Sequence, residues 1–148
     1  MRIVATFEST SFKFPPEDIS ELTEPPGKDV ALWLAARLSK LNKVLVEEPE
    51  PEDFGWYITF LTEGVRYQAV IGPVGDEFWY VVVERVVGIL PAIFGFRRKH
   101  KTPEGLLLVH KALKEAEETS RLQWHSWKSF SGGGVSAFDN GMDMPVAF

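Results

Sequence analysis

Five carboxylates stand among seven residues in the stretch EEPEPED, which runs from Glu47 to Asp53. Paired carboxylates perform acid–base chemistry when burial of one of them separates their pKa values. Pro49 and Pro51 instead favour an extended, solvent-exposed chain, and the stretch lacks the glycine at the turn of a calcium-binding loop. We therefore predict an acidic partner surface or a solubilising loop here, and no catalytic residue, metal or cofactor.

The three histidines lack the spacing of a metal site or of a nucleophile and its base. His100 falls in the basic run RRKHK, His110 lies beside the apolar stripe of an expected helix, and no HExxH is present. His125 stands between two tryptophans on an expected strand. A lone strand histidine is most often a packing or surface residue, so none of the three is predicted to catalyse a reaction.

The charge balance favours a cationic partner over nucleic acid. The chain carries 21 acidic and 16 basic side chains, a net charge of −5, and this average field repels phosphate. The run RRKHK at 97–101 is the one basic cluster, and we interpret it as a soluble collar before a helix. No nucleic-acid binding is predicted.

The composition indicates a cytoplasmic protein that does not cross a membrane. Without cysteine, the chain has no disulfide, thiolate nucleophile or cysteine-based zinc site. The N-terminus lacks the apolar core of a signal peptide. The longest apolar stretch, 78–96, carries Glu84 and Arg85 at its middle, and each would be costly at the centre of a bilayer.

Hydrophobic periodicity predicts eight elements. A helix is indicated by the apolar stripe from Val30 to Leu41, and a second by Pro103 to about Glu118, with Thr102 as its cap. Glu63-Gly64 joins two strands in a tight hairpin, in which Trp56, Ile58 and Phe60 share one face. Expected strands cover 2–7, 44–46, 56–62, 65–71, 78–84 and 121–127, and 86–96 is left undecided.

This order, β-α-β-β-β-β-α-β, predicts an α+β fold: a two-layer sandwich in which a mostly antiparallel sheet of five to six strands carries both helices on one face. A single domain is expected over 1–128. Residues 129–148 are expected to form a glycine-rich tail that is disordered or docked on the body, on a partner or on a second copy in a homodimer.

Alternation along the strands places about half of the strand aromatics on the face turned away from the helices. Tryptophan and tyrosine give large contact areas at low entropic cost, so this face is a candidate binding surface. The aromatics are Trp56, Tyr57, Tyr67, Phe78, Trp79, Tyr80, Trp124 and Trp127.

The segment EPEPEDFGW, with the helix ALWLAARLSKL before it, resembles a family of small bacterial proteins of no assigned activity. The whole profile, small, acidic and free of cysteine, is similar to immunity proteins of bacterial toxin systems. The resemblance spans about residues 28–83, and its specific part is Pro51 to Trp56. It implies that Glu50, Glu52, Asp53 and Trp56 lie near a basic surface of a toxin.

Two functions remain open at this point. The first is a non-catalytic, immunity-type protein-binding module that holds a basic partner through the acidic loop, with Glu50, Glu52, Asp53 and Trp56, and through the adjacent sheet aromatics. The second is an enzyme or small-ligand carrier with a pocket between sheet and helices, in which Glu84, Arg85 and His125 provide the polar groups.

Overall fold

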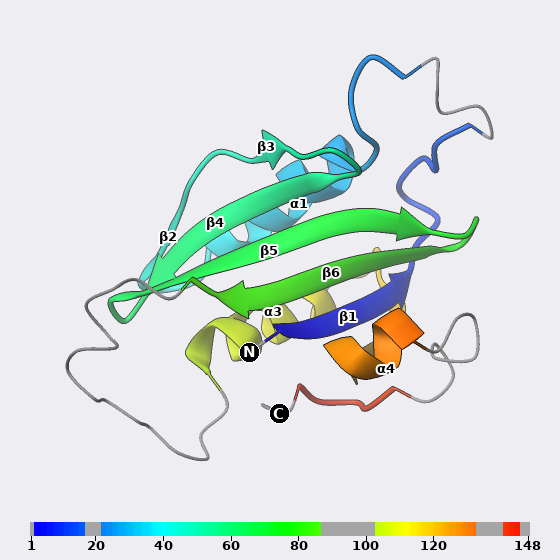
Figure 1. The fold of residues 1–148 in the computed structure, drawn as a ribbon. Helices are drawn as coiled ribbons and strands as arrows, with labels where there is room; N and C mark the ends of the chain where they lie inside the picture. The colour runs from blue at the N-terminus through cyan, green and yellow to red at the C-terminus, as the bar shows by residue number, and fades with distance from the viewer. Residues whose placement is uncertain (1, 17–21, 87–102, 133–140, 146–148) are drawn as a thin grey trace.

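A computed structural model describes residues 2–16, 22–86, 103–132 and 141–145 (Figure 1). They form one open sheet with three helices. The strands are β1 (Arg2–Glu8), β2 (Val44–Val46), β3 (Glu50–Pro51), β4 (Trp56–Thr62), β5 (Val65–Val74), β6 (Phe78–Arg85) and β7 (Ser120–Ser126), and the helices are α1 (Lys28–Ser39), α3 (Glu104–Lys114) and α4 (Trp127–Gly132).

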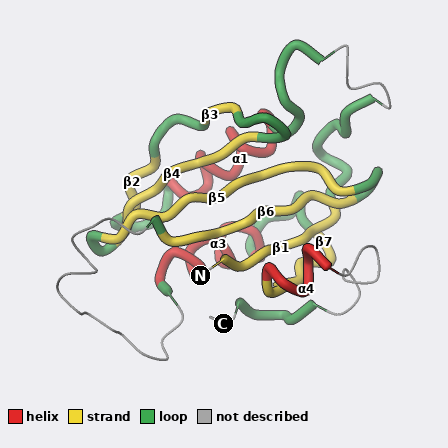
Figure 2. The backbone as a smooth tube through the Cα atoms, viewed as in Figure 1, coloured by secondary structure: helices red, strands yellow, loops and turns green. Residues whose placement is uncertain are grey.

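The sheet has the order β2-β4-β5-β6-β1-β7, and β3 also pairs with β4 (Figure 2). Every pairing among the described strands is antiparallel. The β4–β5 hairpin turns at Glu63 and Gly64, whose φ angles of 49° and 75° are the positive values of a tight hairpin turn. The N-terminal strand β1 lies between β6 and β7, so it is central.

One face of the sheet forms the core under α1 and α3, which lie behind the sheet in the view of Figure 1. The two helices contact each other, and the Arg37 side chain of α1 donates a 2.8 Å hydrogen bond from Nε to the Ala112 carbonyl of α3. Every second residue of each central strand points into this core, as the pleat requires. The largest fully buried side chains are Trp79, Trp124, Phe7, Phe60, Ile3, Leu34, Leu38, Ile58, Ile71, Leu106 and Leu113.

The opposite face, here called the open face, carries α4 beside β1 and β7 (Figure 2). The Phe130 ring of α4 lies 5.7 Å from Tyr80 and 6.4 Å from His125. Beyond α4, Met142 pairs with the outer edge of β7, where it exchanges two backbone hydrogen bonds of 2.8 Å with Trp124. The half of the open face over β4 and β5 carries no helix among the described residues.

The α+β class and the antiparallel sheet are confirmed, whereas the count and order of elements differ from the prediction. The described residues form seven strands instead of the expected five to six, and the added strand is β3 inside the acidic stretch. A third helix, α4, lies on the face expected to be free of helices, and it begins at Trp127, which the alternation had extended into the last strand. Helix α3 ends at Lys114 rather than near Glu118.

Several predictions fall on residues that the structure does not describe. The undecided stretch 86–96 lies outside the described residues from 87 onward, as do the run 97–101 and the cap Thr102. Of the predicted tail 129–148, residues 133–140 and 146–148 are not described, so the boundary at 128 stays a prediction. Within the described part of the chain, no helix is both long and apolar enough to cross a membrane.

Candidate partner-binding surface

The acidic stretch is the edge of the sheet rather than a free loop. β2 pairs with the C-terminal half of β4 and β3 with its N-terminal end, so the chain from Val44 to Pro51 runs along one strand. Pro49 interrupts this run between the two short strands. An edge broken by prolines and covered by carboxylates resists pairing with another strand. We call residues 47–57 the acidic hairpin.

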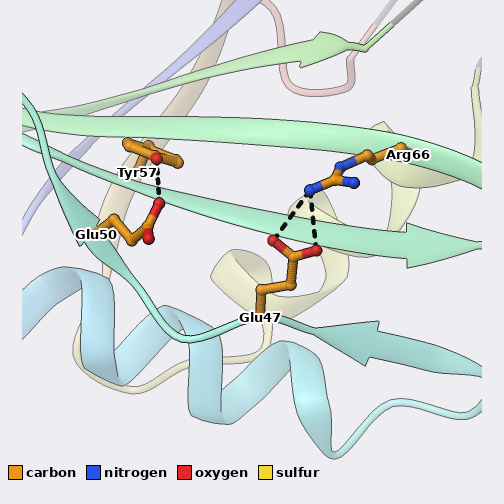
Figure 3. Close-up of polar contacts among 4 residues, drawn as sticks. All are labelled: Glu47, Glu50, Tyr57 and Arg66. Atoms are coloured by element: carbon orange, nitrogen blue, oxygen red, sulfur yellow. Dashed lines mark hydrogen bonds and ion pairs between the residues drawn. The ribbon is translucent and has the colours of Figure 1, made fainter. Parts of the chain in front are cut away.

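Two of its five carboxylates are bound internally (Figure 3). The Arg66 guanidinium of β5 contacts both carboxylate oxygens of Glu47, at 2.9 and 3.1 Å, and the Tyr57 hydroxyl donates a hydrogen bond to Glu50. The Glu47–Arg66 pair is exposed on both sides, so it contributes at most about 1 kcal/mol to stability. These contacts fix the base of the acidic hairpin on the open face.

The tip of the acidic hairpin is a tight turn held against β5. The Glu52 N–H donates a 2.7 Å hydrogen bond to the Gly55 carbonyl, which leaves Asp53 and Phe54 at the outer end. Gly55 lies directly on β5: a Cβ atom there would stand 2.2 Å from the Ile71 carbonyl oxygen, closer than any real contact. The glycine is therefore required by this approach of two backbones.

Beside the tip, a hollow of about 390 Å³ opens on the open face, lined by Glu52, Asp53, Phe54, Gly55 and Tyr80. We call it the tip hollow. Tyr80 leans over Gly72, where an added Cβ would stand 2.5 Å from the tyrosine oxygen. Burial raises the pKa of Tyr80, and the charge of Glu52 raises this pKa further.

Several carboxylates of the acidic hairpin raise the pKa of Tyr57. The hydrogen bond to Glu50 raises the pKa of Tyr57, and so do loss of solvent and the charges of Glu50, Glu52 and Glu47. The glutamates thus share one local field of negative potential. No three His, Asp or Glu side chains within the described ranges converge as a metal ion would need.

The predicted partner residues fall in two places. Glu50, Glu52 and Asp53 are exposed on the acidic hairpin, whereas Trp56 lies on the core face with 6% of its surface exposed. Its indole Nε1 donates a 2.8 Å hydrogen bond to the Pro25 carbonyl, and Lys28 Nζ lies 5.5 Å from its ring centre. Trp56 therefore holds the entry to α1 against β4 and is no part of the exposed surface.

Glu84, Arg85 and His125, the polar residues of the alternative function, do not converge on one pocket. Glu84 forms a 3.0 Å ion pair with Arg2 on the open face, and Arg85 follows it with the opposite orientation, across from Tyr67. His125 is 2% exposed on the open face, with its Nε2 2.8 Å from the Thr6 hydroxyl. Burial lowers the pKa of His125. The tip hollow lies on the open face, not between sheet and helices.

Three aromatic residues belong to this surface but are not in the predicted set of partner-binding residues. Phe54 is 78% exposed at the tip, and Tyr57 and Tyr80 point to the open face. The alternation of β4 contained the signal for Tyr57: because Trp56 shares a face with Ile58 and Phe60, Tyr57 must take the other face. Phe54 could have been identified from its place between Asp53 and Gly55 at a turn.

This surface can attract and hold a cationic group. Exposed carboxylates next to exposed rings offer charge-assisted hydrogen bonds and ring faces, and they lack a buried acid–base pair for catalysis. Comparison of the chain with protein-family models, with curated proteins and with solved structures gave no match.

Proposed function

We propose that this chain is a non-catalytic protein-binding module that holds a basic partner through the acidic hairpin and the adjacent half of the open face. The partner is attracted by the carboxylates and then packs on the rings beside them. The surface consists of Glu48, Glu50, Glu52, Asp53, Phe54, Tyr57 and Tyr80.

The single observation that carries this proposal is the exposure of Phe54 among uncompensated carboxylates. A large apolar ring that is 78% exposed at a turn gains little for the fold, but it is a good contact for a partner. Glu52 and Asp53 are exposed beside it, Glu48 is exposed farther along the same sheet edge, and none of the three has a side-chain partner among the described residues. Charges of one sign beside an aromatic anchor accelerate association with a partner of opposite charge.

The finer form of the proposal is an immunity-type protein of the cytoplasm that covers a cationic surface of a toxin. The net charge of −5 and the absence of cysteine fit that role. Self-association through the C-terminal residues remains a separate prediction, and the binding of small ligands by Glu84, Arg85 and His125 receives no support from their positions.

The partner can be captured by photo-crosslinking in cells of the source organism. A benzophenone amino acid at Phe54 replaces one exposed ring with another and therefore leaves the fold intact. The matched control places it at Leu32, 48% exposed on the outer side of α1. We expect a discrete product with a basic protein from Phe54 and none from Leu32; the same products from both positions would contradict the proposal.

The captured protein is then tested for charge-driven binding. Replacing Glu48, Glu52 and Asp53 by lysine reverses three charges that have no side-chain partner in the part of the chain that the structure describes. We expect an association rate at least about tenfold slower at low salt, and a smaller difference at high salt. Lysine at the exposed Glu63, Glu115 and Glu117 changes net charge equally and is the control. If both variants slow association equally, the acidic hairpin is only a solubilising segment and does not contact the partner.

A further inference from the structure

We infer that the tip hollow is a binding site for one arginine side chain of the partner, which inserts its guanidinium between Phe54 and Tyr80. This inference rests on the proposed function and adds the chemical group that the surface recognises.

The hollow has the lining that a guanidinium needs. Its walls hold two aromatic rings, Phe54 and Tyr80, and two carboxylates, Glu52 and Asp53. None of the ring contacts among the described residues involves Phe54, so its faces are open to a ligand. A volume of about 390 Å³ exceeds that of the planar head and leaves room for the aliphatic stem.

The carboxylates of the acidic hairpin divide into engaged and available ones. Glu47 is neutralised by Arg66, and Glu50 accepts from Tyr57. The two carboxylates that line the hollow have no side-chain partner in the described part of the chain. The strongest unmet attraction for a cation therefore lies at the tip, next to the rings, and not along the base.

The tip is a fixed feature and does not need a partner to form it. Gly55 lies on the Ile71 carbonyl and Tyr80 lies on Gly72, so both walls of the hollow rest on β5. A preformed site avoids the entropic cost of ordering a loop on binding. Burial raises the pKa of Tyr80 most, and the charge of Glu52 raises it further, so the carboxylate acts on the tyrosine across the hollow.

Arginine fits this site better than lysine. A guanidinium is planar, stacks on ring faces, and presents five donors in a fixed fork, whereas an ammonium is a compact, strongly hydrated point charge. A lining of two aromatic residues and two carboxylates matches the chemistry of the guanidinium. The site should therefore discriminate between two side chains of equal charge.

The experiment is an NMR titration of the intact chain with N-acetyl-arginine methylamide, compared with the lysine analogue and the neutral citrulline analogue. We expect saturable shifts confined to the amides of residues 52–55 and 80, with arginine binding at least about threefold more tightly than lysine and citrulline not binding. Equal shifts with arginine and lysine, spread over the whole acidic hairpin, would overturn the inference.

Single substitutions distinguish arginine binding in the tip hollow from general attraction by the negative charge of the acidic hairpin. Phe54→Leu keeps an apolar side chain but removes the ring, and Glu52→Gln removes one lining charge; each should weaken arginine binding at least about threefold. Glu48→Gln removes an equally exposed charge outside the hollow and should have a smaller effect. If Glu48→Gln weakens binding as much as Glu52→Gln, the arginine site is wrong, while a basic partner found by crosslinking would still stand.

Discussion

The Tyr57 hydroxyl donates a hydrogen bond to the Glu50 carboxylate across the β3–β4 pair, where the two residues face each other in the register. This contact joins the acidic hairpin to the open face. It also raises the pKa of Tyr57, because a proton on the phenol is needed for the bond and a tyrosinate would be repelled by Glu50, Glu52 and Glu47.

Glu50→Gln should therefore lower the pKa of Tyr57 toward its ordinary value of about 10, since the charge is lost while an acceptor remains. An alkaline NMR titration of ring-labelled tyrosine measures this pKa directly. Glu48 is not among the groups that raise the pKa of Tyr57, so Glu48→Gln should lower this pKa less. A Tyr57 titration that is identical in all three proteins would contradict the contact.

Buried His125 and partly buried His110 predict a loss of stability in acid. Burial lowers the pKa of His125, and burial with the charge of Lys114 lowers that of His110. His110 Nδ1 accepts a 3.0 Å hydrogen bond from the Trp124 indole, so it cannot also carry a proton. The native state therefore binds protons more weakly than the unfolded chain.

For a group with a depressed native pKa, the stability is complete above the unfolded pKa of about 6.5 and is lost as pH falls through the native pKa. Urea unfolding from about pH 8 to about pH 5 should thus show a falling free energy of unfolding. His125→Gln and His110→Asn should each flatten this dependence. A slope unchanged in the double variant would show that other groups cause the acid sensitivity.

Sequence periodicity was sufficient for the fold class because the strong elements are locally encoded. The β4–β5 hairpin follows from two apolar runs around Glu63-Gly64, and α1 from its stripe of Val30, Leu34 and Leu38. β3 was missed because it is two residues long and contains Pro51, and only its pairing with Trp56 and Tyr57 makes it a strand.

The charges of the site were predicted residue by residue, whereas its rings were predicted only as a group of strand aromatics of which about half would face away from the helices. Runs of acids stay in water in nearly any fold, so the exposure of Glu50, Glu52 and Asp53 required no tertiary information. Which aromatics are covered depends on pairing instead: Trp56 is covered by Pro25 and Lys28, residues about thirty positions earlier. Local sequence cannot encode such a long-range contact.

This position of Trp56 predicts that its loss affects stability and not binding. Trp56→Phe removes the hydrogen bond to the Pro25 carbonyl and part of the contact with Lys28, at a cost of about 1–3 kcal/mol in free energy of unfolding. Association with the captured partner, measured below the unfolding transition, should stay within about twofold. If the binding free energy falls by more than the free energy of unfolding, Trp56 is part of the partner-binding surface after all.

Gly55→Ala tests whether the tip must lie on β5. The new methyl group would overlap the Ile71 carbonyl oxygen, so the tip must lift and the free energy of unfolding should fall by about 1–3 kcal/mol. Arginine binding at the tip hollow should fall with it. Gly132→Ala is the control, since nothing lies within 4 Å of a Cβ atom at that glycine. Equal stability of both variants would mean that the tip is not fixed by this approach.

The prolines of the acidic hairpin also prevent the sheet edge from pairing with a strand of another molecule. β2 and β3 are separated at Pro49, neither Pro49 nor Pro51 can donate to a ladder, and the edge also exposes Leu45, at 70%. Replacing both prolines by threonine should join the two strands into one long edge that pairs with another molecule. Light scattering after size-exclusion chromatography should then detect assemblies larger than those of the natural chain.

Replacing both prolines by glutamate separates the two sources of protection. This variant gains the same two N–H donors but adds two negative charges to an edge already rich in them, and like charges oppose edge-to-edge pairing. We expect its assembly state to match the natural chain. Because the threonine and glutamate variants differ only in charge and β propensity, association of both would assign the protection to the prolines alone, and association of neither would contradict the role of the edge.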